Sequence, residues 1–102
     1  MPTKKKFTVL FQNEALVHLQ KSIDYYNLQQ QGLGKRFGIA VRKAGKVLEK
    51  NPFFQLRYDY IRCLPVEKFP FMIHFSVEEE IKSVRIFAVL HTALNPEENW
   101  HY

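Results

Sequence analysis

The stretch that decides the fold is residues 69–77, Phe69-Pro70-Phe71-Met72-Ile73-His74-Phe75-Ser76-Val77. Apolar side chains fill every second position from Phe71 to Val77, and Met72, His74 and Ser76 lie between them. Because successive side chains point to opposite faces of a β-strand, this alternation predicts a strand with one apolar face.

The residues that follow are expected to form its hairpin partner. The acidic run 78–80 reads as the turn, and residues 81–91 read as the second strand. The even positions of this second strand are all aliphatic, and we expect them to pack beneath helices: Val84, Ile86, Ala88 and Leu90. On this parity, His74, Arg85 and His91 face the other, open side of the sheet.

Two helices are predicted upstream of this hairpin. Apolar side chains recur at steps of three and four along residues 13–28 and again along residues 33–50. Asn13 is a suitable N-cap, and Pro52 disfavours helix at the residue before it. The short glycine-containing turn between the two segments indicates an antiparallel helix hairpin.

Together these elements predict one α+β domain over residues 1–102. The order is β-α-α-β-β-β, with strands also expected at residues 7–11 and 55–64 and a short C-terminal helical turn at 96–100. The helix hairpin packs on one face of a small, mainly antiparallel sheet and leaves the other face open. No apolar run reaches the ~18 residues of a membrane span, so we expect a soluble, cytoplasmic protein without a membrane partner.

The charge is unevenly distributed along the chain. Residues 1–50 hold ten basic and three acidic side chains, and residues 51–102 hold five basic and seven acidic ones. This basic first half suits an acidic protein or nucleic acid, although it could equally serve only solubility. The histidines lack zinc-ligand spacing and no glycine-rich phosphate loop is present, so we expect no metal and no cofactor.

The remaining candidates for function are basic and aromatic. Metal-free RNA cleavage needs a base, a cation beside the phosphate and an acid, which histidine and arginine can supply. On the predicted sheet and second helix, the candidates for nucleic-acid contact are Lys35, Arg36, Arg42, Lys43, Lys46, Arg57, Tyr58 and His74. The alternative for each of them is an ordinary solvated surface.

Four short motifs span most of the second half of the chain: Ile61-Arg62-Cys63-Leu64, Phe69-Pro70-Phe71-Met72-Ile73-His74-Phe75, Ile86-Phe87-Ala88-Val89-Leu90-His91-Thr92 and Asn95-Pro96-Glu97-Glu98-Asn99-Trp100. Together these motifs resemble the RelE/ParE toxin superfamily of type II toxin–antitoxin modules. Arg62 and His91 match the family pattern, whereas Met72 and Leu94 stand where the family often has arginine. The family's element order is the order predicted above.

The resemblance implies a toxin that is bound by a cognate antitoxin, which we expect to be acidic and to fold on binding. It implies a ribosome-dependent mRNA endonuclease, acting on the ribosome and mRNA, with the candidate catalytic residues Arg62, Arg85, His91, His101 and Tyr102. The alternative is a ParE-like poison that binds DNA gyrase without chemistry, or an attenuated family member. The two missing arginines favour the binding alternative.

Overall fold

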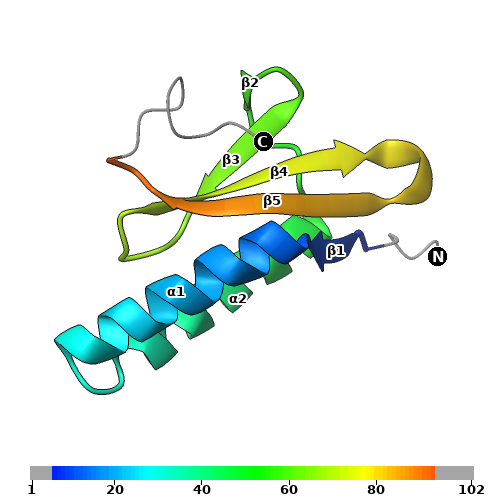
Figure 1. The fold of residues 1–102 in the computed structure, drawn as a ribbon. Helices are drawn as coiled ribbons and strands as arrows, with labels where there is room; N and C mark the ends of the chain where they lie inside the picture. The colour runs from blue at the N-terminus through cyan, green and yellow to red at the C-terminus, as the bar shows by residue number, and fades with distance from the viewer. Residues whose placement is uncertain (1–5, 94–102) are drawn as a thin grey trace.

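The computed structural model describes residues 6–93, which form two helices packed on a five-stranded sheet. The elements in chain order are β1 (Thr8–Phe11), α1 (Asn13–Gln29), α2 (Leu33–Lys50), β2 (Leu56–Tyr58), β3 (Ile61–Pro65), β4 (Phe71–Glu78), the 3₁₀ turn η1 (Glu79–Ile81) and β5 (Ser83–His91). The strand order is β1-β5-β4-β3-β2, with β1 parallel to β5 and every other pair antiparallel. Both helices lie on one face of the sheet (Figure 1), which confirms the predicted α+β class.

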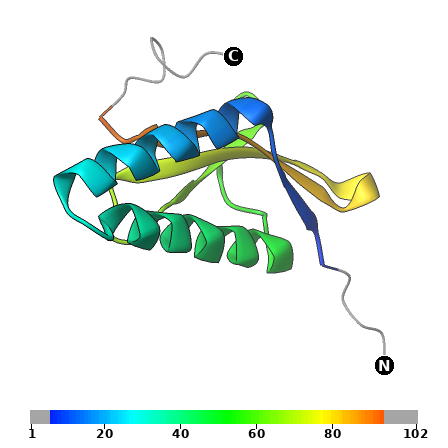
Figure 2. The same ribbon diagram turned by 60° about the horizontal axis from the view of Figure 1, so that its bottom comes forward.

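The helix hairpin is held together at its turn by a close contact. Figure 2 shows α1 and α2 side by side, joined by a turn in which Gly32 has a φ of 84°. The Gly34 amide donates a hydrogen bond to Asn27 Oδ1 at 2.9 Å. A side chain at Gly34 would collide with the backbone carbonyl oxygen of Ile23, so only glycine lets the two helices approach this closely.

The core lies between the helices and the sheet. α2 buries Phe37, Val41 and Leu48 almost completely, and β4 buries Ile73 and Phe75 against them. Burying a side chain of this size contributes roughly 1.5–3 kcal/mol, so the alternating pattern of β4 accounts for much of the stability of this layer. The alternation predicted for β4 is therefore confirmed.

A β-bulge in β5 changes the predicted parity of that strand. Phe75 pairs with Ile86, but the neighbouring residue His74 pairs with Ala88, so Phe87 is an extra residue in β5. Beyond the bulge, Val89 instead of Ala88 joins the helix-facing core. The expectation that Ala88 and Leu90 pack under the helices is wrong for this reason: they pair with His74 and Met72 on the opposite face.

Two smaller differences concern the segments that flank the helices and the sheet. Residues 55–64 form two strands instead of one, because Asp59 takes a left-handed conformation with a φ of 47° and turns the chain between β2 and β3. Gln12, and not Asn13, is the N-cap residue of α1.

The helical turn predicted at 96–100 lies outside the residues that the structure describes. Within the described part, neither helix is long and apolar enough to cross a membrane.

Candidate functional site

His74 lies in a small buried cluster on the sheet face that the helices leave uncovered. Its Nδ1 is 2.9 Å from the Tyr58 hydroxyl and 3.4 Å from Cys63 Sγ. Burial, with a smaller effect of the Arg57 charge, lowers the pKa of His74 to about 4. Burial also raises the pKa of the Cys63 thiol to about 11. At neutral pH both groups are therefore uncharged, and the charge of Arg57 acts on both of them.

The arginines proposed for catalysis are not brought together. Arg85 faces the uncovered side of the sheet opposite Ser76 and forms an ion pair with Glu78 at 3.1 Å. Arg62 pairs with Phe75 and therefore lies on the helix side, where its guanidinium donates to the Phe54 carbonyl oxygen. These two cations lie on opposite faces of the sheet and cannot grip one phosphate.

His91 is also displaced from its predicted place. The bulge at Phe87 turns His91 to the helix side, where it pairs with Phe71 at a ring-centroid distance of 5.3 Å. The expectation that it sits beside His74 on the open face is wrong. Its Nδ1 accepts a hydrogen bond from the Ala93 amide at 3.0 Å. In the neutral ring, this bond leaves the proton on Nε2, so His91 presents a donor and not a base.

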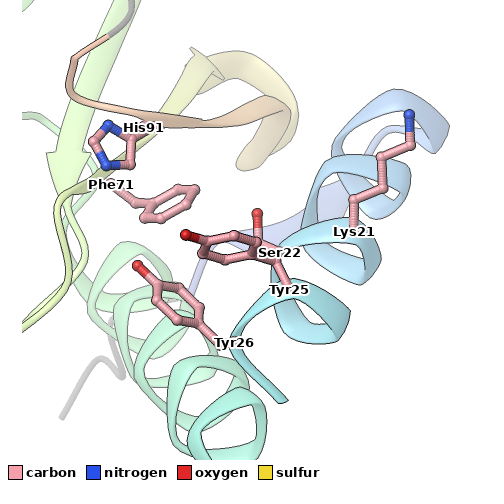
Figure 3. A pocket seen from close by; sticks show the side chains of 6 residues that line it. All are labelled: Lys21, Ser22, Tyr25, Tyr26, Phe71 and His91. Atoms are coloured by element: carbon pink, nitrogen blue, oxygen red, sulfur yellow. The ribbon is translucent and has the colours of Figure 1, made fainter. Parts of the chain in front are cut away.

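The new position of His91 makes it part of a cleft between α1 and the adjoining ends of β4 and β5. This aromatic cleft has a volume of about 370 Å³ and is lined by Lys21, Ser22, Tyr25, Tyr26, Phe71 and His91. Figure 3 shows the hydroxyl groups of Tyr25 and Tyr26 pointing toward Phe71 and His91, whereas the Lys21 side chain extends away from them at the rim. Sequence reasoning predicted only His91 of these six as a site residue, because Phe71 was read as a core position of its strand and the helix over residues 13–28 was given no functional role.

The predicted basic surface of α2 is present. Its members are all exposed on that helix: Lys35, Arg36, Arg42, Lys43 and Lys46. Three adjoining hollows run along α2 opposite the loop between β3 and β4 and share Lys43. We call them the α2 groove. Its apolar lining is Leu33, Ile39, Ala40, Ala44, Val47, Leu64, Pro65 and Phe69, its cationic lining is Lys6, Arg36, Lys43, Lys46, Lys50 and Lys68, and its carboxylates are Glu49 and Glu67.

One ion pair crosses the α2 groove. Lys43 Nζ lies 3.0 Å from Glu67 Oε1, and both side chains are largely exposed. The hydrogen bond and charge of Lys43 lower the pKa of Glu67. An exposed pair of this kind is weak, so a carboxylate from another molecule can replace Glu67 at Lys43 at little cost. The remaining catalytic candidates, His101 and Tyr102, lie outside the described residues.

Comparison with known proteins agrees with this architecture. Neither a protein-family model nor a curated protein matches the sequence. One similar solved structure is described as a chromosomal ParDE toxin–antitoxin system from P. aeruginosa, with a TM-score of 0.74 and 16% identity over 86% of this chain and 98% of that chain. Another is described as the RelBE2 toxin–antitoxin complex from Mycobacterium tuberculosis, with a TM-score of 0.63 and 20% identity over 90% of this chain and 98% of that chain. The chain therefore shares the α+β fold of chains in these two toxin–antitoxin structures, as its motifs predicted.

Proposed function

We propose that this protein is the toxin of a type II toxin–antitoxin module and that it acts on its target by binding, without cleaving RNA. The observation that carries the first part is the fold, because it covers nearly the whole of chains from two toxin–antitoxin structures. The four sequence motifs support the same assignment independently of the coordinates.

The α2 groove is the proposed docking surface for the antitoxin. Val47 and Ile39 are exposed apolar side chains in the groove, and a row of cations flanks them. An amphipathic helix with acidic residues beside its apolar stripe matches both features. A segment that is disordered alone would fold as it enters the groove, and its carboxylates would compete with Glu67 for Lys43.

The scattered positions of the candidate catalytic groups support the second part of the proposal. Arg62 and Arg85 lie on opposite sheet faces, and His91 lies in the aromatic cleft with its Nδ1 already occupied. His74 is buried and has a strongly lowered pKa. The catalytic candidates Arg62, Arg85 and His91 therefore do not converge on one point. Arg57 does lie near the Tyr58–His74–Cys63 cluster, but the imidazole there is buried and its pKa is lowered to about 4. This arrangement favours ParE-like binding of DNA gyrase over cleavage of ribosome-bound mRNA.

Induction in bacterial cells tests both parts of the proposal. We expect growth arrest, and we expect the gene to lie beside a small reading frame whose acidic product relieves the arrest when it is co-expressed. Messenger RNA cleavage and the DNA-damage response are followed in parallel, and we expect only the second to rise. Cleavage of mRNA at the ribosome would overturn the binding mechanism, and growth without arrest would overturn the toxin assignment.

An Arg85→Ala variant serves as the matched control in that experiment. Arg85 faces solvent in part and contacts Glu78, so its removal should leave the fold intact. If the protein acts by cleaving RNA with this cation beside the phosphate, the variant loses toxicity together with cleavage. If the protein acts as proposed, neither variant nor wild type produces cleaved mRNA.

A further inference from the structure

The aromatic cleft has no role in the proposed function. The polar side chains that line it share one property, which is that they can donate a hydrogen bond. Every polar side chain that lines it is cationic or can donate a hydrogen bond: Lys21, Ser22, Tyr25, Tyr26 and His91. Among the residues described there, no carboxylate lines it. The hydrogen bond from Ala93 fixes Nε2–H as the donor that His91 offers. The complementary polar group on a ligand is therefore an anion.

The apolar lining of the cleft is made of planar rings. Phe71 forms a buried wall, with the His91 ring 5.3 Å away and the Tyr26 ring 6.0 Å away. Tyr25 packs edge-on against Tyr26 at 5.5 Å, yet 57% of its surface remains exposed. An exposed ring beside a donor-lined hollow is a platform on which a nucleobase can stack.

We propose that the aromatic cleft binds one nucleotide unit, with the base against Tyr25 and Tyr26, the phosphate on His91 Nε2–H, and Lys21 adding its positive charge at the rim. The volume of about 370 Å³ is near the lower end of the roughly 300–1,000 Å³ typical of small-molecule sites, so the cleft takes one such unit. The ligand is either a free nucleotide or one residue of a single strand, because both offer the same base and phosphate.

The cleft is a binding site and not a second place for RNA cleavage. Among the described residues that line it, His91 is the only imidazole, and the bond from the Ala93 amide occupies the lone pair that a base would need. The inference is therefore independent of how the toxin acts on its target. RNA binding by the isolated protein tests the cleft alone, whereas the induction experiment above tests the mechanism, so the two proposals can fail separately.

Fluorescence anisotropy with a labelled single-stranded RNA of about ten nucleotides tests the cleft directly. Physiological salt is required, because a basic protein binds any RNA at low ionic strength. We expect Tyr25→Ala to weaken binding about tenfold, since stacking on an aromatic ring contributes roughly 1–3 kcal/mol per base. Lys21→Gln should weaken binding several-fold by removing the charge at the rim.

The matched controls are an exposed tyrosine and an exposed lysine away from the cleft. Tyr60→Ala removes a ring that is 60% exposed next to Phe87 on the other face of the sheet. Lys82→Gln removes a cation from the turn before β5, at the opposite end of that strand from His91. Both controls should bind RNA as the wild type does. Equal affinity of Tyr25→Ala and wild type would overturn the proposal.

Competition experiments distinguish the sources of the nucleotide. If adenosine monophosphate displaces the RNA from the wild type, the cleft takes free nucleotides. If it does not, while Tyr25→Ala still weakens RNA binding, the cleft takes a unit of a single strand. Displacement by inorganic phosphate or by a polyglutamate peptide as effectively as by the nucleotide would show an anion site without base recognition and would overturn the proposal.

Discussion

The close approach of the two helices at Gly34 makes a prediction that a single methyl group can test. In Gly34→Ala, the new Cβ would collide with the Ile23 carbonyl oxygen and with the Asn27 side-chain amide. The backbone carbonyl cannot rotate away, so α2 must shift, and the 2.9 Å hydrogen bond from the Gly34 amide to Asn27 Oδ1 weakens. Overpacking that moves the backbone typically costs about 1–3 kcal/mol, and the lost hydrogen bond about 1 kcal/mol.

The higher helix propensity of alanine offsets up to about 1 kcal/mol of this cost. We therefore expect Gly34→Ala to lower the free energy of unfolding by about 1–3 kcal/mol, as measured by urea denaturation. Gly45→Ala is the control on the same helix, because nothing lies within 4 Å of its added Cβ. That variant should gain about 0.5–1 kcal/mol. A Gly34→Ala protein as stable as the wild type would refute the close helix packing on which the position of Tyr26 depends.

Three further predictions follow from the described contacts. His91→Ala should lower the melting temperature by several degrees, because it removes the hydrogen bond from the Ala93 amide, which contributes about 1 kcal/mol. The same variant should bind the antitoxin as the wild type does in calorimetry. Glu67→Gln should tighten antitoxin binding severalfold, because it frees Lys43; an unchanged or weaker affinity would count against acidic docking at that residue. The pKa of His74 is about 4 in the folded state and 6.5 in the unfolded chain, so the unfolded state binds more protons between these values. Stability should therefore fall as pH falls from 6.5 to 4, and His74→Gln should reduce that slope in urea titrations at several pH values.

The sequence predicted the elements whose pattern has one apolar face. The steps of three and four in α2 and the alternation in β4 correspond directly to their buried sides. β5 was different because its residues 86–90 are all apolar, so parity alone could not reveal the extra residue at Phe87. That one residue decides whether His91 lies beside His74 or beside Phe71.

The candidate site depended on pairings that the sequence does not encode locally. Arg62 lies on the helix side because it pairs with Phe75, and its orientation was open until that register was known. Lys21 and Tyr25 lie on the polar side of α1 in the sequence pattern and enter a cleft only because β5 ends opposite them. The basic surface of α2 was predicted correctly, since it needs only the helical period and the positions of the lysines and arginines.

The affinity of the cognate antitoxin for Val47→Glu tests the central claim most directly. Val47 is 43% exposed in the α2 groove, and Leu16, at 47% exposed on α1, provides a control of matched size and exposure that lies outside the groove. A carboxylate on the apolar lining should repel an acidic helix and remove an apolar contact. We therefore expect Val47→Glu to weaken antitoxin binding at least about tenfold. The control Leu16→Glu should bind as the wild type does. Wild-type affinity in Val47→Glu would contradict docking in the α2 groove, and failure of the unaltered protein to bind the neighbouring acidic protein would contradict its assignment as a toxin.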